Sequence, residues 1–153
     1  MAKLNDITPN FNWNQIERQL ADFREYVIDQ EVEKLRFIGE QFANKARNKQ
    51  GEGQAYQDRT GNLRHSIGFA IIKNGEILDL NLDQGHSEAH ENARMLAGQF
   101  AGQYTEGLVL VGFAGMEYAA AVEAKGYDVI TGSTPSIQEL MSELMEIWKH
   151  PGK

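Results

Sequence analysis

The chain has 153 residues, no cysteine and a formal net charge of -7. This length, with an apolar content of 41%, is typical of one domain with a single hydrophobic core, so we expect one domain over residues 1–153. The absence of cysteine excludes disulfides, thiolate nucleophiles and cysteine-ligated metals. The negative charge opposes tight binding to nucleic acid or to an anionic membrane. No apolar run approaches the roughly 18 residues of a membrane span, so we expect no membrane partner.

Apolar residues recur at spacings of three and four through residues 12–49, which predicts one long N-terminal helix. Asn12, with Gln15 three residues later, has the pattern of an N-terminal capping pair. A helix of this length spans about 50 Å, more than a domain of this size requires. We therefore expect part of it to protrude, or a break near Gly39. The polar, glycine-containing segment 50–62 is predicted to be a mobile loop.

The α+β core is expected to occupy residues 63–149. Asn74 and Gly75 stand between two β-rich runs and supply the positive φ angles that a type I′ turn requires. This predicts a hairpin in which 66–73 pairs with 76–82. The second of these runs alternates leucine with mainly polar residues, so one of its faces is expected to meet the core.

Helices and short strands alternate in the remainder of the chain. Small and apolar residues at helical spacing predict a mid-chain helix within 87–107, and the apolar run 108–113 predicts a buried strand. A further strand is expected at 127–131, and Thr134-Pro135 is expected to open a C-terminal helix with proline at its first position. The predicted fold is α+β: a small, mostly antiparallel sheet of about four strands, packed by the long N-terminal, mid-chain and C-terminal helices.

Histidines provide the best enzymatic pattern in the sequence. His86 and His90, with Glu91 adjoining, have the spacing at which two imidazoles on one helix can share a metal ion. The order differs from H-E-x-x-H, and we favour a solvated helix start. His65 and Ser66 are adjacent, so on a strand they point to opposite faces and are poorly placed to exchange a proton. We therefore expect no catalytic residue, no metal and no cofactor.

Two short segments of the chain resemble a bacteriophage protein family. They are TGNLRHSI and, some fifty residues later, GMEYAAAVEAKGYDVI. The family is that of the head-tail connector and tail-completion proteins named after the tenth gene product of a lambdoid phage. The residues that match its motifs are Thr60, Gly61, Leu63, Arg64, Ser66 and Ile67 in the first segment, and Tyr118, Ala119, Val122 and Glu123 in the second.

The resemblance implies a non-enzymatic virion subunit that assembles as a homo-oligomeric ring at the junction of capsid and tail. Its implied partners are further copies and neighbouring phage connector or tail proteins, and its implied location is the virion, preceded by the cytoplasm of the bacterial host. We expect Gly61 to permit a turn, Leu63 and Ile67 to anchor the entry into the sheet, and Arg64 to serve an interface. Two alternatives are a small histidine-dependent metal-binding hydrolase and a prophage-encoded protein-binding module.

Overall fold

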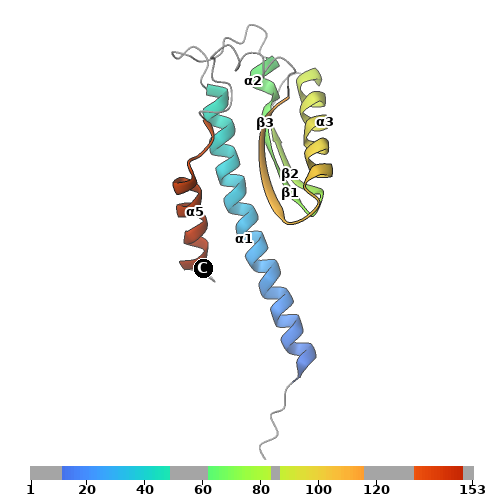
Figure 1. The fold of residues 1–153 in the computed structure, drawn as a ribbon, viewed down its shortest axis with the longest axis vertical. Helices are drawn as coiled ribbons and strands as arrows, with labels where there is room; N and C mark the ends of the chain where they lie inside the picture. Colours follow the sequence, from blue (N-terminus) through green and yellow to red (C-terminus); the bar gives the residue numbers. More distant parts are fainter. Residues whose placement is uncertain (1–11, 49–61, 84–86, 116–132, 150–153) are drawn as a thin grey trace, which may run out of the picture.

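The computed structural model describes residues 12–48, 62–83, 87–115 and 133–149. Its dominant element is α1, Trp13–Asn48, a single helix of 36 residues without a break at Gly39 (Figure 1). Asn12 caps its start, because the Asn12 side-chain oxygen accepts a hydrogen bond from the backbone N–H of Gln15 at 3.3 Å. The prediction of a long N-terminal helix is therefore confirmed.

A small antiparallel sheet follows α1. Its strands are β1, Ile67–Lys73, β2, Glu76–Leu82, and β3, Leu108–Ala114, in the spatial order β2-β1-β3. The predicted hairpin is present, and Asn74 and Gly75 at its turn have φ angles of 51° and 83°. Ser66 ends the short helix α2, Asn62–Ser66, rather than beginning the strand, and its hydroxyl donates a hydrogen bond back to the carbonyl oxygen of Leu63. The helix α3, Ser87–Gln103, lies between β2 and β3 in the chain.

The sheet of the described residues has three strands, where the sequence predicted about four. The predicted fourth strand, 127–131, lies outside the described residues and stays a prediction. Of the predicted loop 50–62, only Asn62 is described, and it is the first residue of α2. No helix in the described ranges is both long enough and apolar enough to cross a membrane.

The described elements form three layers, with α1 on one face of the sheet and α3 on the other (Figure 1). The central strand β1 is buried at six of its seven residues. Because successive strand residues point to opposite faces, Phe69 and Ile71 pack toward α1, whereas Ala70 and Ile72 pack toward α3. The near-continuous apolar character of β1 thus reflects burial on both faces.

Two glycines allow α1 to lie close to the sheet. A Cβ atom at Gly39 would stand 2.5 Å from the ring of Phe69, and one at Gly112 would stand 2.6 Å from the ring of Phe42. Real Cβ atoms essentially never approach a carbon so closely. The two aromatic rings therefore occupy the space that the side chain of any residue larger than glycine would need at positions 39 and 112. The helix-sheet contact therefore depends on glycine on both of its sides.

Two arginines of α1 tie the helix to the hairpin. Arg36 donates from Nε to a carboxylate oxygen of Asp79 at 2.6 Å, and this hydrogen bond raises the pKa of Arg36 above its ordinary value. Arg47 donates from Nε and Nη2 to the carbonyl oxygen of Ile67, at 3.1 and 2.7 Å, and from Nη2 to the side-chain oxygen of Asn81 at 3.3 Å. Polar contacts thus fix the position of α1 beside both β1 and β2.

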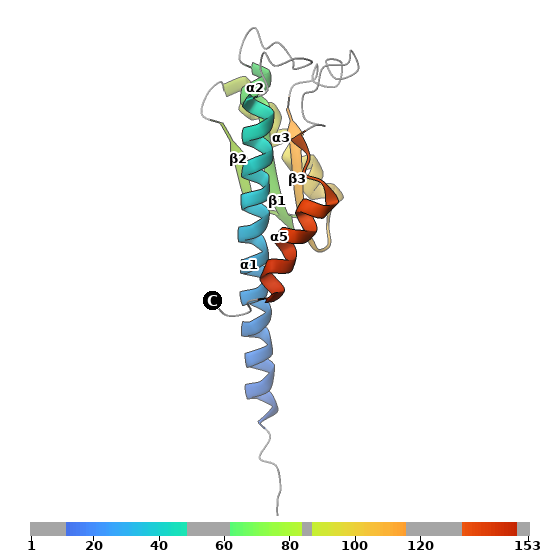
Figure 2. The same ribbon diagram turned by 90° about the vertical axis from the view of Figure 1, so that its left-hand side faces the viewer.

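The last described element is α5, Ile137–Lys149, which lies beside α1 (Figures 1 and 2). The sequence predicted Pro135 as the first residue of this helix, and this is wrong. The helix starts two residues later, behind a capping box. In this box the backbone N–H of Ser136 donates to the Glu139 carboxylate at 2.7 Å, and the N–H of Glu139 donates to the Ser136 hydroxyl at 3.2 Å. The hydrogen bond from the Ser136 backbone lowers the pKa of Glu139 below its ordinary value.

Candidate assembly surface

The first phage-like segment lies at the entrance to the sheet. Leu63 and Ile67 are buried in the cluster between α1 and the sheet. Ser66, which precedes Ile67 in the chain, is also buried. The Ser66 hydroxyl donates to the carbonyl oxygen of Leu63 at 2.7 Å, which directs it toward the backbone of α2. Arg64 is half-buried. The motif residues outside the described ranges are Thr60, Gly61, Tyr118, Ala119, Val122 and Glu123.

The histidines of the described residues belong to two separate places. His65 Nδ1 lies 3.2 Å from an Asp83 carboxylate oxygen, so this pair links α2 to the end of β2. His90 is half-buried in α3, and its proposed metal-binding partner His86 lies outside the described residues. Within the described ranges, no three histidine, aspartate or glutamate side chains are grouped so that they could hold a metal ion.

The N-terminal half of α1 carries apolar residues on one face and projects beyond the sheet (Figure 1). We call this set the apolar stripe. Leu20 and Phe23 are 61% and 56% exposed, whereas Phe42 in the same helix is only 8% exposed. The spacing of three and four residues predicted the stripe, but the pattern alone did not show that it lies beyond the end of the sheet. The stripe consists of Trp13, Ile16, Leu20, Phe23 and Val27.

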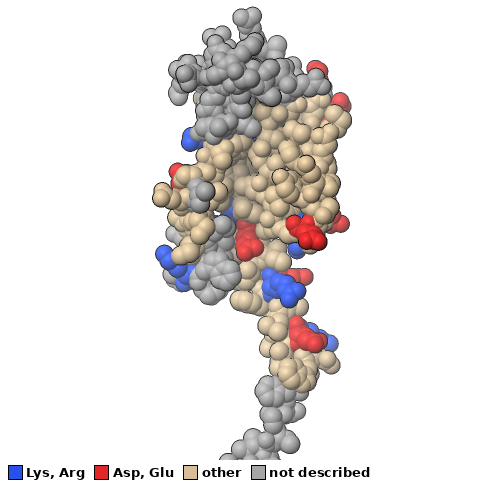
Figure 3. Space-filling view, in the orientation of Figure 1, with Lys and Arg blue, Asp and Glu red and all other residues tan. Residues whose placement is uncertain are grey.

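Charged side chains accompany the stripe on the projecting half of α1, where Figure 3 shows both signs. Helical spacing places Glu17 and Arg24 next to one edge of the stripe, seven residues apart. The stripe is therefore an apolar face with a mixed-charge border. Such a composition, an apolar centre with a polar rim, is typical of a surface that contacts another protein.

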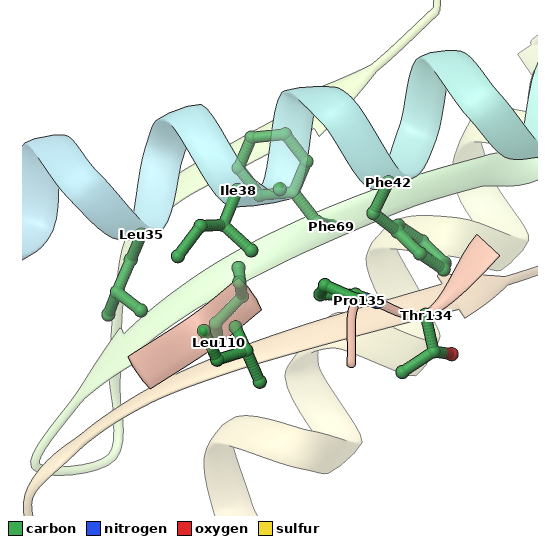
Figure 4. A pocket seen from close by; sticks show the side chains of 10 residues that line it. Leu35, Ile38, Phe42, Phe69, Leu110, Thr134 and Pro135 are labelled. Atoms are coloured by element: carbon green, nitrogen blue, oxygen red, sulfur yellow. The ribbon is translucent and has the colours of Figure 1, made fainter. Parts of the chain in front are cut away.

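A concave apolar site lies between α1, the sheet and the segment leading into α5 (Figure 4). It has a volume of about 380 Å³. A neighbouring hollow of about 250 Å³ shares Ile38, Phe42, Pro135 and Leu140 with it, and Lys45 and Glu139 are among the polar residues that line it. We call the two together the apolar groove. The residues that line the larger hollow are Leu35, Ile38, Gly39, Phe42, Phe69, Leu110, Gly112, Thr134, Pro135 and Leu140.

No local pattern of residues predicts the apolar groove, because its walls come from segments that are far apart in the chain. The only local signals are Gly39 within a helical pattern and Gly112 within an apolar strand, and each reads as an ordinary packing glycine. Comparison with protein-family models, curated proteins and solved structures found no match to this chain. Its function must therefore be inferred from its motifs and from these two apolar surfaces.

Proposed function

We propose that this chain is a non-enzymatic structural protein of a phage or prophage, acting at the head-tail junction or in tail completion and assembling as an oligomeric ring. The observation that carries the proposal is the apolar stripe on the projecting half of α1. Large apolar side chains such as Leu20 and Phe23 gain free energy when they leave water, and neighbouring side chains of the described chain leave them more than half exposed. A second protein surface would bury them.

The two phage-like segments support the same proposal and give it its biological setting. Three residues of the first segment are buried in the core at the start of the central strand, which is the position of a motif that stabilises the fold. They are Leu63, Ser66 and Ile67. We propose that copies of the chain and adjacent connector or tail proteins are its partners, first in the host cytoplasm and then in the virion. We also propose that residues 127–131 form a fourth strand of the sheet, as the sequence predicts.

The acidity of the chain suits a ring through which DNA passes. With a net charge of -7, a subunit repels the phosphate backbone, so a ring of such subunits would let DNA move without holding it. The assembled ring should accordingly retain little DNA at low salt. Tight retention under those conditions would contradict this part of the proposal.

The test of assembly is the mass and shape of the purified protein. Light scattering during size-exclusion chromatography should show a mass that rises with concentration, and negative-stain electron microscopy should show closed rings. The same measurements with portal or tail proteins from the same phage genome would detect assembly that requires a partner. A monomer at every concentration and in every mixture would refute the proposal.

The genes beside this one give an independent test. Portal, capsid and tail genes on either side would support a connector or tail-completion protein. A position among host-directed genes, away from the structural genes, would instead support a protein-binding module carried by a prophage. Uptake of one metal ion per chain that is abolished when His86 and His90 are both replaced by alanine would support the metal-dependent alternative.

A further inference from the structure

We propose that the apolar stripe of one copy docks into the apolar groove of the next copy. This inference rests on the proposed function and names the contact that would build the ring. It joins two different surfaces of the same chain. A contact of this kind is heterologous, and repeated around an axis it closes into a ring or continues as a filament.

The two surfaces cannot meet within one chain. The stripe lies on α1, and a later part of the same unbroken helix forms one wall of the groove. Phe23 of the stripe and Leu35 of the groove are held about 18 Å apart along the helix axis, at 1.5 Å per residue. The stripe can therefore enter a groove of this kind only on another molecule.

The shapes and chemistry of the two surfaces are complementary. The stripe is convex, with Leu20 and Phe23 standing out from a helix. The groove is concave and lined mainly by apolar side chains, and the space-filling view shows a hollow between α5 and the sheet, above the projecting half of α1 (Figure 3). A helix whose apolar face enters a hydrophobic groove is a recurring mode of protein recognition.

The charged borders of the two surfaces also match. Lys45 and Glu139 stand beside the groove, and Glu17 and Arg24 stand beside the stripe. In the proposed complex Glu17 would face Lys45 and Arg24 would face Glu139, beside the attraction between Lys45 and Glu139 that exists within one chain. Pairs of this kind at the rim of an interface add little affinity but favour the correct partner and orientation.

The area of the stripe indicates that one such contact is weak. At about 200 Å² for each large apolar side chain, the exposed parts of Trp13, Leu20 and Phe23, the three most exposed residues of the stripe, amount to roughly 370 Å². This is well below the roughly 800 Å² per partner of a stable interface. In a closed ring every subunit uses both its stripe and its groove, so closure stabilises an assembly that isolated pairs do not.

Paired variants test the contact, one for each surface. Phe23→Asp places a charge in the stripe, and Leu140→Arg places one at the groove. Each should weaken self-association about tenfold or more, as expected for the centre of an interface. The matched controls are Met141→Arg, which is next to Leu140 on α5 but does not line the groove, and Met95→Asp on α3. Both controls should assemble like the unaltered protein.

Mixing the two variants distinguishes a heterologous contact from a symmetric one. Phe23→Asp retains an intact groove and Leu140→Arg retains an intact stripe, so at high concentration the mixture should form a weak one-to-one heterodimer that grows no further, which neither variant forms alone. If Leu140→Arg assembles normally while Phe23→Asp does not, the stripe pairs with something other than the groove and the inference is wrong. In that case rings of the unaltered protein would still support the proposed function.

Cross-linking provides a second measurement that does not depend on disrupting either surface. Since the chain has no cysteine, Leu20→Cys and Leu140→Cys introduce one thiol each. A mixture of the two should give a cross-linked dimer with a short thiol-reactive linker, and a mixture of Leu20→Cys with Met95→Cys should not. Absence of the first product in a sample that forms rings would overturn the inference. Circular dichroism and thermal melting would verify that each variant is folded.

Discussion

Gly39 and Gly112 determine, at the scale of single residues, how closely α1 approaches the sheet. Each faces an aromatic ring across the helix-sheet contact, from opposite sides of it. A methyl group at either position would have to displace Phe69 or Phe42, and both rings are buried among other core residues. The displacement would also alter the apolar groove, which these four residues help to line.

Replacing Gly112 by alanine should therefore destabilise the fold, by about 1–3 kcal/mol, the usual cost of overpacking a core. The matched control is Gly98→Ala in α3, where a Cβ atom would meet nothing within 4 Å. That control should stabilise the protein by about 0.5–1 kcal/mol, because alanine favours the helix. Urea unfolding monitored by circular dichroism measures both changes. Equal stability of the two variants would contradict the close packing of α1.

Arg47 provides a second residue-scale test, because lysine cannot reproduce its hydrogen bonds. Two guanidinium nitrogens donate to the carbonyl oxygen of Ile67, and one of them also reaches Asn81. Lysine keeps the charge but has a single ammonium group, so Arg47→Lys should cost about 1–2 kcal/mol. Arg18→Lys, on the exposed part of the same helix, should change the free energy of unfolding by less than about 0.5 kcal/mol.

The start of α5 shows, at the scale of one element, how local hydrogen bonds determine a boundary. Ser136 and Glu139 exchange hydrogen bonds across the first turn, so the helix begins behind Ser136 and Pro135 stays outside it. The pKa of Glu139 is lowered because its carboxylate accepts the hydrogen bond from the Ser136 backbone. The carboxylate form is thus the one that this helix start favours.

The capping box should weaken in acid. A folded-state pKa below the ordinary value of 4.5 means that the contribution of Glu139 is complete above that pH and is lost as the pH falls through the folded-state pKa. An NMR titration should therefore show the Glu139 carboxyl protonating below pH 4.5, with the Ser136 amide signal moving in parallel. Ser136→Gly should return the midpoint toward 4.5 only in part, because its backbone N–H remains. A midpoint above 4.5 in the unaltered protein would refute the capping contact.

At the scale of the whole molecule, α1 has two halves with different roles. The C-terminal half packs on the sheet through Phe42, Ala43 and Ala46, which are at most 8% exposed. The N-terminal half projects beyond the sheet (Figure 1), and its residues Leu20 and Phe23 are more than half exposed. One element thus serves both the fold and the surface that we propose for assembly.

This division predicts that substitutions in the two halves of the molecule act on different properties. Leu63→Ala, at 1% exposure, should destabilise the fold by about 2–5 kcal/mol. Leu20→Ala, at 61% exposure, should change the stability of the monomer by less than about 0.5 kcal/mol and should reduce self-association. Chemical unfolding at low protein concentration measures the first quantity, and sedimentation at high concentration measures the second. A large loss of monomer stability in Leu20→Ala would show that the stripe packs within its own chain.

The sequence was sufficient for those parts of the fold that depend on local patterns. Asn74-Gly75 predicted the hairpin because its two positive φ angles are a local requirement, and α1 was predicted from its long helical periodicity. The start of α5 was predicted two residues too early because proline at the first helical position and a serine-glutamate capping box compete for the same boundary. Apolar periodicity identified the stripe, but the groove could not be predicted, since Phe69 and Leu110 meet α1 only after the chain has folded.

Burial of β1 on both of its faces has a consequence for the dynamics of the protein. Its amide groups are paired with β2 on one side and with β3 on the other, and α1 and α3 shield them from above and below. Solvent can reach the amides of Ala70 and Ile71 only when the layers separate, so their deuterium uptake should be the slowest in the chain and should report the free energy of global opening. Amides in the N-terminal half of α1 should exchange much faster in the monomer, and they should slow when copies associate.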